Sequence, residues 1–194
     1  MNVFLGITGA SGAPYAARLL RALSGAGVDV GLCISDAGVQ VCATELYDDI
    51  ALSREEVTAR LVEGLDGVDV VGLRDYTTPY ASGSARVDGY VVCPCSMSTA
   101  ASIAAGAMAN LVHRAASVAL KEERKLILVP RETPLSTIHL ENLLRLRRAG
   151  ATVLFAAPGF YQSPRTVDDL VNFVVARCLD QLGIDQTLVG RWGQ

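Results

Sequence analysis

Small and hydroxyl-bearing residues follow the first hydrophobic run of the chain. Gly9, Ser11 and Gly12 lie between the apolar run Val3–Ile7 and a helical segment that has Pro14 in its first turn. Glycines let the backbone approach a ligand closely, and a helix N-terminus offers unpaired N–H groups to an anion. Ser11 also suits an N-cap. The loop therefore predicts an anion-binding turn, with a plain strand-to-helix turn that binds nothing as the alternative.

A second hydroxyl-rich loop follows the apolar run Tyr90–Cys93. Its segment Ser96-Met97-Ser98-Thr99 opens another predicted helix and supplies three hydroxyls beside free N–H groups. By the same physics this segment predicts a second anion or flavin site. Ordinary helix capping is the alternative, and it explains one hydroxyl more easily than three.

The glycine spacing argues against a dinucleotide site. Glycines 6, 9 and 12 do not form the pattern G-x-G-x-x-G, so the NAD fingerprint is absent. Asp36, after the second apolar run, stands where an NAD enzyme would hold a ribose. Its neighbour Ser35 suits a phosphate or a flavin equally well.

Charged residues also stand where they could meet a ligand. Arg131 and Glu132 directly follow the fifth apolar run, and we favour a functional site there over a surface ion pair. Arg177 lies in the apolar stretch 173–179, which predicts a buried guanidinium. Such a group needs a partner: phosphate fits it best, and a carboxylate is an equally good local alternative.

Four further residues carry weaker signals. Arg114 and Lys121 are seven apart on one predicted helix, hence on roughly one face, and alone they read as a solvated basic stripe. Tyr161 could donate its hydroxyl to a phosphate, although a lone tyrosine more often edges a core. Glu45 ends an apolar helix, where burial would raise its pKa, and a surface position is the default.

Composition limits the classes of function. The 194 residues are 51% hydrophobic and 19% charged, with a net charge of −3 and no basic run, so nucleic acid is not an expected partner. Such a low charge content is typical of a chain buried in an oligomer. Five cysteines without a CxxC pair, and only two histidines, predict neither a metal site nor disulfides. The uncharged stretch 89–112 is interrupted by Pro94 and hydroxyl residues, so we expect no membrane span and a cytoplasmic protein.

The elements that position these residues alternate between strands and helices. Apolar runs without polar alternation predict buried parallel strands at Val3–Ile7, Val28–Ile34, Val68–Leu73, Tyr90–Cys93, Leu126–Val129 and Thr152–Ala156. Helical periods occupy residues 14–25, 36–46, 54–64, 97–107, 110–123, 138–149 and 166–182. This order predicts a doubly wound, Rossmann-like parallel sheet in a single α/β domain, residues 1–185, with a C-terminal tail, 186–194. Ligands bind beyond the carboxyl ends of such strands, where the polar loops gather.

Several blocks of residues, taken together, carry a family resemblance that covers nearly the whole chain. They are Gly6-Ile7-Thr8-Gly9-Ala10-Ser11-Gly12, Pro79-Tyr80-Ala81-Ser82-Gly83-Ser84, Cys93-Pro94-Cys95-Ser96, Val129-Pro130-Arg131-Glu132-Thr133-Pro134-Leu135 and Pro158-Gly159-Phe160-Tyr161. In this order and spacing they resemble the bacterial flavin prenyltransferases, formerly described as a phenylacrylic or polyprenyl-hydroxybenzoate decarboxylase subunit. The loop Tyr76–Pro79 departs from the aromatic or Met that the family normally shows there.

The resemblance implies an activity and a set of site residues. It implies metal-independent transfer of a dimethylallyl group from dimethylallyl monophosphate to N5 and C6 of reduced FMN, giving prenylated FMN for a partner decarboxylase. It implies that FMN is held by Gly9, Ala10, Ser11, Ser35, Ser96, Met97, Ser98, Thr99 and Arg131. It implies that the phosphate is bound by Arg114, Lys121, Glu132, Tyr161 and Arg177, some reaching from a neighbouring subunit of a homo-oligomer, typically a dodecamer. Ser11, Glu45, Lys121 and Glu132 are the implied catalytic residues.

Other functions remain open from the residues. Cysteine decarboxylases that use FMN resemble this chain in strand and helix order, but carry a catalytic histidine in mid-chain, and no histidine precedes His113 here. A non-catalytic FMN carrier that feeds a partner decarboxylase is a second alternative. An NAD oxidoreductase is disfavoured by the missing glycine fingerprint.

Overall fold

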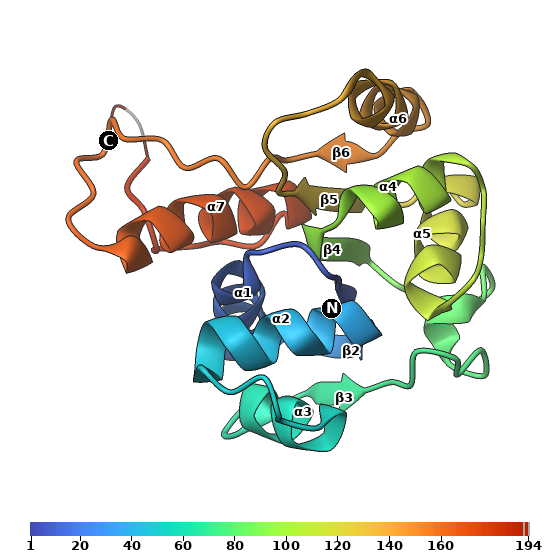
Figure 1. Cartoon of the computed structure of the whole chain (residues 1–194), viewed down its shortest axis with the longest axis horizontal. Helices are drawn as coiled ribbons and strands as arrows, with labels where there is room; N and C mark the ends of the chain where they lie inside the picture. The colour runs from blue at the N-terminus through green and yellow to red at the C-terminus, as the bar shows by residue number, and fades with distance from the viewer. Residues whose placement is uncertain (192, 194) are drawn as a thin grey trace.

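The chain folds around one parallel sheet (Figure 1). The computed structural model describes residues 1–191 and 193. Its strands are β1 (Asn2–Ile7), β2 (Asp29–Ile34), β3 (Val68–Val70), β4 (Gly89–Cys95), β5 (Leu126–Pro130) and β6 (Thr152–Val153). They run in the order β3-β2-β1-β4-β5-β6, and every pairing is parallel. The doubly wound sheet predicted from the apolar runs is confirmed.

The helices follow the predicted periods closely. They are α1 (Ala13–Gly25), α2 (Asp36–Tyr47), α3 (Arg54–Val62), α4 (Met97–Ala104), α5 (Leu111–Lys121), α6 (Thr137–Arg148) and α7 (Val167–Leu182), with a short 3-10 helix η1 (Pro79–Ala81). Hydroxyl or amide side chains cap most of them: Ser35 caps α2 and Ser96 caps α4 by accepting the N–H of the third helical residue. The predicted cap Ser11 is wrong, because Gly12 occupies the N-cap of α1 and no side chain of its own caps that helix.

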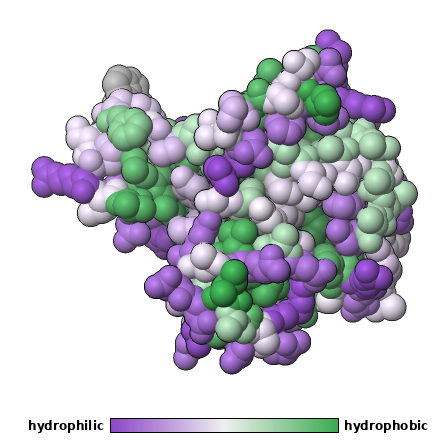
Figure 2. All heavy atoms as spheres, viewed as in Figure 1, coloured by the Kyte–Doolittle hydropathy of each residue, from purple (hydrophilic) through white to green (hydrophobic). Residues whose placement is uncertain are grey.

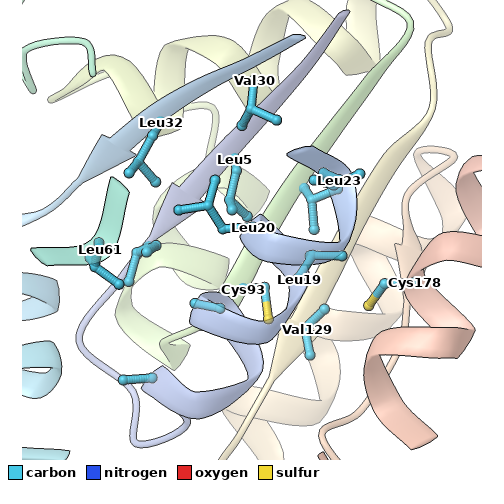
Figure 3. Close-up of a cluster of buried hydrophobic side chains, with 14 of the residues drawn as sticks. Leu5, Leu19, Leu20, Leu23, Val30, Leu32, Leu61, Cys93, Val129 and Cys178 are labelled. Atoms are coloured by element: carbon cyan, nitrogen blue, oxygen red, sulfur yellow. The ribbon is translucent and has the colours of Figure 1, made fainter. Parts of the chain in front are cut away.

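Two apolar cores cover the two faces of the sheet. Alternate strand residues point to opposite faces, so Leu5 joins one core while its neighbour Phe4 joins the other. The first core packs α1, α2, α3 and α7 on the sheet, and Figure 3 shows the leucines of α1 beside Cys93 of β4 and Cys178 of α7. The second core packs α4, α5, α6 and η1 on the other face. Both faces are covered, which explains why the strands are apolar throughout.

The edge strands are shorter than the apolar runs predicted. The runs 68–73 and 152–156 supply only β3 and β6, because each edge strand has a single neighbour to pair with. After β3 the predicted long loop crosses back to β4. Tyr80 anchors this loop. Its ring centroid lies 5.3 Å from that of Phe4, and its hydroxyl donates to Oδ1 of Asn2 at 2.9 Å. A Cβ on Gly31 would stand 2.1 Å from the Tyr80 ring, so β2 needs glycine there.

The remaining expectations about organisation concern the membrane and the tail. No helix within the described residues is long and apolar enough to cross a membrane. Beyond α7, the described part of the predicted tail contacts the body, since Nε2 of Gln162 donates to the Gly190 carbonyl at 2.7 Å. Positions 192 and 194 of that tail lie outside the described residues. The boundary between 185 and 186 stays a prediction.

Candidate functional site

The loops after β1 and β4 meet in the middle of the sheet, where the strand order reverses. Oγ1 of Thr8 donates to the Pro94 carbonyl at 2.8 Å and accepts the N–H of Ser96, also at 2.8 Å. Thr8 is only 1% exposed, so these bonds are shielded from water. Ligands of doubly wound sheets bind at this reversal point. Thr8 therefore fixes the two predicted loops beside each other in the place where the fold binds ligands.

The N-terminus of α4 presents main-chain donors at this meeting of the loops, where doubly wound sheets have their ligand crevice. Oγ of Ser96 accepts the N–H of Thr99 at 3.2 Å and also contacts its hydroxyl at 3.0 Å. Met97 and Thr99 are both 7% exposed, whereas Ser98 is exposed. Among the described residues no hydrogen bond uses the N–H groups of Met97 and Ser98. Two free amides at a helix N-terminus beside an exposed hydroxyl suit a phosphate, so the residues fit the phosphate of FMN.

The N-terminus of α1 is already occupied by a carboxylate. Oε2 of Glu45, in the last turn of α2, accepts the N–H groups of Gly12 and Ala13, each at 2.8 Å. Within one chain these two amides are therefore not free for a ligand, and FMN binding by Gly9, Ala10 and Ser11 stays a prediction. Glu45 lies exposed in the last turn of α2, as the default of a surface position predicts, and the alternative of a buried carboxylate is wrong. Glu45 acts here as a helix cap supplied from a distance.

The rest of the first loop remains close to β5. Nε of Arg131 donates to the Ser11 carbonyl at 3.1 Å, which brings these two predicted residues together across β4. Glu132 is half-buried beside Arg131, and its Oε1 accepts the N–H of Thr133 at 3.1 Å. Gly9 packs so closely against α2 that a Cβ on it would stand 2.5 Å from the Cβ of Ala37. The next residue, Ala10, is only 5% exposed.

The end of β2 carries the residues considered for a ribose or a phosphate. Ser35 accepts the N–H of Gly38 at 3.0 Å as the cap of α2. Asp36 forms an ion pair with Arg54, and the same guanidinium donates to the Ile34 carbonyl at 2.6 Å. The contact of Arg54 with the end of β2 was not predicted from the sequence. The position of an arginine at the first residue of α3 is the signal that could have indicated it. Asp36 is therefore engaged within the protein.

The two cations of α5 lie against the long loop after β3. Nε of Arg114 donates to the Ala81 carbonyl at 2.9 Å. Lys121 pairs with Glu122, and its Nζ lies so near Gly83 that a Cβ there would stand 2.6 Å from it. The predicted shared face is confirmed, because both side chains reach the segment 81–83. Lys121 keeps 51% of its side chain exposed, so it remains accessible to an anion.

Tyr161 and Arg177, far apart in sequence, line one hollow of about 300 Å³ beside α7. The Tyr161 ring meets that of Phe173 edge-on, with centroids 5.7 Å apart. The predicted burial of Arg177 is wrong: 48% of its side chain is exposed, and it pairs with Asp180 one turn along the helix. The carboxylate partner, which the sequence left open, is the one present within a single chain.

The two cationic groups are not brought together within one chain. Figure 1 shows α5 and α7 at opposite ends of the molecule, with the β1 and β4 loops between them. Burial raises the pKa of the Cys95 thiol to about 12, so this thiol stays protonated and is a poor nucleophile at neutral pH. Within the described residues, no three His, Cys, Asp or Glu side chains gather as metal ligands would. In a single chain, the loops after β1 and β4 thus lie centrally, with separate cationic groups on either side.

Known flavoproteins are similar to this chain in both sequence and structure. The sequence model of the Flavoprotein family matches residues 1–179. The chain is 51% identical to a flavin prenyltransferase UbiX of Halalkalibacterium halodurans, over 98% of this chain and 92% of the relative. Its structure is similar to that of a dodecameric FMN-dependent UbiX-like decarboxylase from Escherichia coli O157:H7, with a TM-score of 0.87, 45% identity and all of both chains covered. It is similar also to AnUbiX (PadA1) in complex with FMN and dimethylallyl pyrophosphate, with a TM-score of 0.87, 38% identity, and 100% and 97% of the two chains covered.

Proposed function

Because this chain belongs to the flavin prenyltransferase family, we propose that it joins a dimethylallyl group from dimethylallyl monophosphate to reduced FMN. The product would be prenylated FMN, passed on to a partner decarboxylase. The observation that carries the proposal is the meeting of the loops after β1 and β4, where the free amides and hydroxyls at the start of α4 suit a single phosphate. Reduced FMN supplies the two nucleophilic positions, N5 and C6, and the protein supplies binding, orientation and charge.

FMN occupies the crevice with its phosphate at the start of α4. The amides of Met97 and Ser98 and the Ser98 hydroxyl bind the phosphate. Gly9, Ala10, Ser11, Ser35, Ser96, Thr99 and Arg131 complete the flavin site. The hydrogen bonds of Thr8 that hold the loops after β1 and β4 together support this placement. One phosphate matches the absence of the dinucleotide fingerprint.

The allylic phosphate needs positive charge when it leaves. Arg114, Lys121 and Arg177 neutralise charge on the departing oxygen, Tyr161 donates a hydrogen bond, and Glu132 acts as proton donor. Since α5 and α7 lie apart within one chain, these groups act together across a contact between copies. The dodecameric relative supports such an assembly. We expect light scattering to give a homo-oligomer larger than a dimer, and a monomer mass at micromolar concentration would contradict this.

Ring closure adds a proton to the double bond of the N5-bound allyl group, joins its tertiary carbon to C6 and removes the proton from C6. Glu45 and Ser11 lie at the first loop and would move this proton. Only Oε2 of Glu45 bonds the α1 amides, so Oε1 remains available to a proton. Glu45→Gln should leave attachment at N5 largely intact and slow closure by about 100-fold, the scale of a lost general base. Closure at the normal rate in Glu45→Gln would assign the proton to Ser11 or water.

The decisive experiment combines reduced FMN and dimethylallyl monophosphate under anaerobic conditions. We expect the flavin to gain the mass of one dimethylallyl group less one hydrogen, which leaves with the phosphate, and to change its absorbance. A protein that binds FMN but leaves its mass unchanged would act as an FMN carrier instead. Release of CO₂ from a peptidyl-cysteine substrate would indicate a cysteine decarboxylase. A reaction without reductant is the control.

A cytoplasmic location belongs to the same proposal. All five cysteines are buried and unpaired, as expected of a chain kept in a reducing compartment. Fractionation of expressing cells, followed by detection of the protein in the cytoplasmic fraction, tests it.

A further inference from the structure

The segment that follows α7 forms one wall of the hollow that contains Tyr161 and Arg177. On one side the hollow is bounded by Tyr161, Phe173 and Arg177, and on the other by Gln186 and Arg191 of the C-terminal segment. Its volume of about 300 Å³ lies at the lower end of the range of small-molecule pockets. The C-terminal segment is therefore part of the candidate phosphate site, and its side chains face the same space as the predicted phosphate ligands.

Hydrogen bonds hold this wall in place. Gly183 ends α7 in the left-handed conformation, which turns the chain back. Oε1 of Gln186 then accepts the N–H groups of Leu188 at 2.8 Å and Val189 at 3.2 Å. Nε2 of Gln162, from the loop before α7, donates to the Gly190 carbonyl at 2.7 Å. The segment is thus tied both to itself and to the loop of Tyr161, so Arg191 arrives at a defined place.

The charges in the hollow do not balance. Asp180 lies between two guanidinium groups: it pairs with Arg177, and its Oδ1 lies 3.7 Å from Nη2 of Arg191. The Asp180 side chain is 16% exposed, whereas those of Arg177 and Arg191 are 48% and 51% exposed. One carboxylate faces two cations, which leaves one positive charge in excess. Guanidinium groups present forked donors that match phosphate oxygens.

We propose that Arg191 is a second guanidinium ligand for the phosphate of the allylic substrate, positioned by the C-terminal segment. The inference rests on the proposed function for the identity of the substrate, but not for the binding of an oxyanion. Asp180 holds both arginines at the hollow before the anion arrives, and the phosphate then binds the donors that face the cavity. Arg191 thus contributes mainly to phosphate capture rather than to the chemistry at the flavin.

The experiment compares Arg191→Ala and Arg191→Lys with wild type, each loaded with FMN. Binding of inorganic phosphate is measured by calorimetry, and KM and kcat for dimethylallyl monophosphate are measured in parallel. Loss of a charged hydrogen bond should weaken phosphate binding and raise KM by about 10-fold or more in Arg191→Ala, with a smaller change in kcat. Arg191→Lys, which keeps the charge, should recover part of the loss. FMN content should be unchanged.

Arg147→Ala is the matched control, because Arg147 is an exposed arginine in the last turn of α6, away from the hollow. It should bind phosphate as wild type does. Equal phosphate affinity in wild type and Arg191→Ala, or a wild type that binds no phosphate, would overturn the inference. Failure of the proposed function is a separate result: wild type would then form no prenylated flavin, while the calorimetry would still decide whether Arg191 binds an oxyanion.

Discussion

Removing the carboxylate of Glu45 should loosen the start of α1. Its Oε2 accepts hydrogen bonds from the N–H groups of Gly12 and Ala13, each with an N···O distance of 2.8 Å. No side chain of the N-cap residue caps α1. Loss of a capping acceptor costs about 0.5–2 kcal/mol, and loss of a negative charge at a helix N-terminus costs about 0.3–1 kcal/mol more. Glu45→Ala should therefore cost about 2 kcal/mol. For a chain of this length that corresponds to a fall in Tm of about 4–8 °C.

Hydrogen exchange gives the sharpest readout of this change. In Glu45→Ala the amides of Gly12 and Ala13 should exchange about 30-fold faster, since about 1.4 kcal/mol corresponds to a factor of ten. Glu45→Gln keeps one oxygen acceptor and loses the charge, so its cost should be about 1 kcal/mol or less. Glu141→Ala is the control, because within the described residues the exposed side chain of Glu141 forms no hydrogen bond or ion pair. Unchanged exchange at residues 12 and 13 in Glu45→Ala would refute the capping role.

Three further changes test other parts of the structure. Thr8→Val keeps the side-chain shape but leaves the N–H of Ser96 without its acceptor. We expect the free energy of unfolding, measured by denaturation, to fall by about 1–3 kcal/mol. FMN should also bind more weakly, which fluorescence titration measures. Arg177→Ala should abolish prenyl transfer while FMN stays bound, and near-normal turnover would leave Arg177 a structural ion-pair residue. Burial raises the pKa of Cys33 and Cys42 to about 12, so both thiols stay protonated at pH 8 and should not react with Ellman's reagent until the protein unfolds. Rapid reaction of either in the native protein would contradict their burial.

The central strands could be predicted from the sequence because a strand that is buried on both faces has apolar residues at successive positions. The run Val3–Ile7 lies within one residue of β1, and Leu126–Val129 lies within one residue of β5. At the edge strands β3 and β6 the apolar runs are longer than the strands that form. The apolar run 152–156 continues past β6, which pairs with β5 over only two residues. Hydrophobicity reports burial, whereas a strand also needs a neighbour to pair with.

The loops that carry the candidate site could be predicted from the sequence, whereas several of their local contacts could not. The loops of Ser96 and Arg131 lie at the expected edge because parallel strands all end there. The partner of the α1 amides could not be found locally, because Glu45 lies 33 residues beyond Gly12. The Arg177 pair was within reach of the sequence, since Asp180 follows at a spacing of three on a helix.

The contacts that close the central crevice join residues far apart along the chain. Thr8 bonds Pro94 across a separation of 86 residues, and Arg131 bonds Ser11 across 120. Contacts of such separation form slowly, because long loops must be closed before they stabilise anything. A nascent chain that has not yet emerged past residue 131 therefore has β1 and its glycine loop but no complete crevice. Flavin binding is in this sense a late event of folding, and a ligand that binds only the finished crevice shifts the equilibrium toward the fully folded chain.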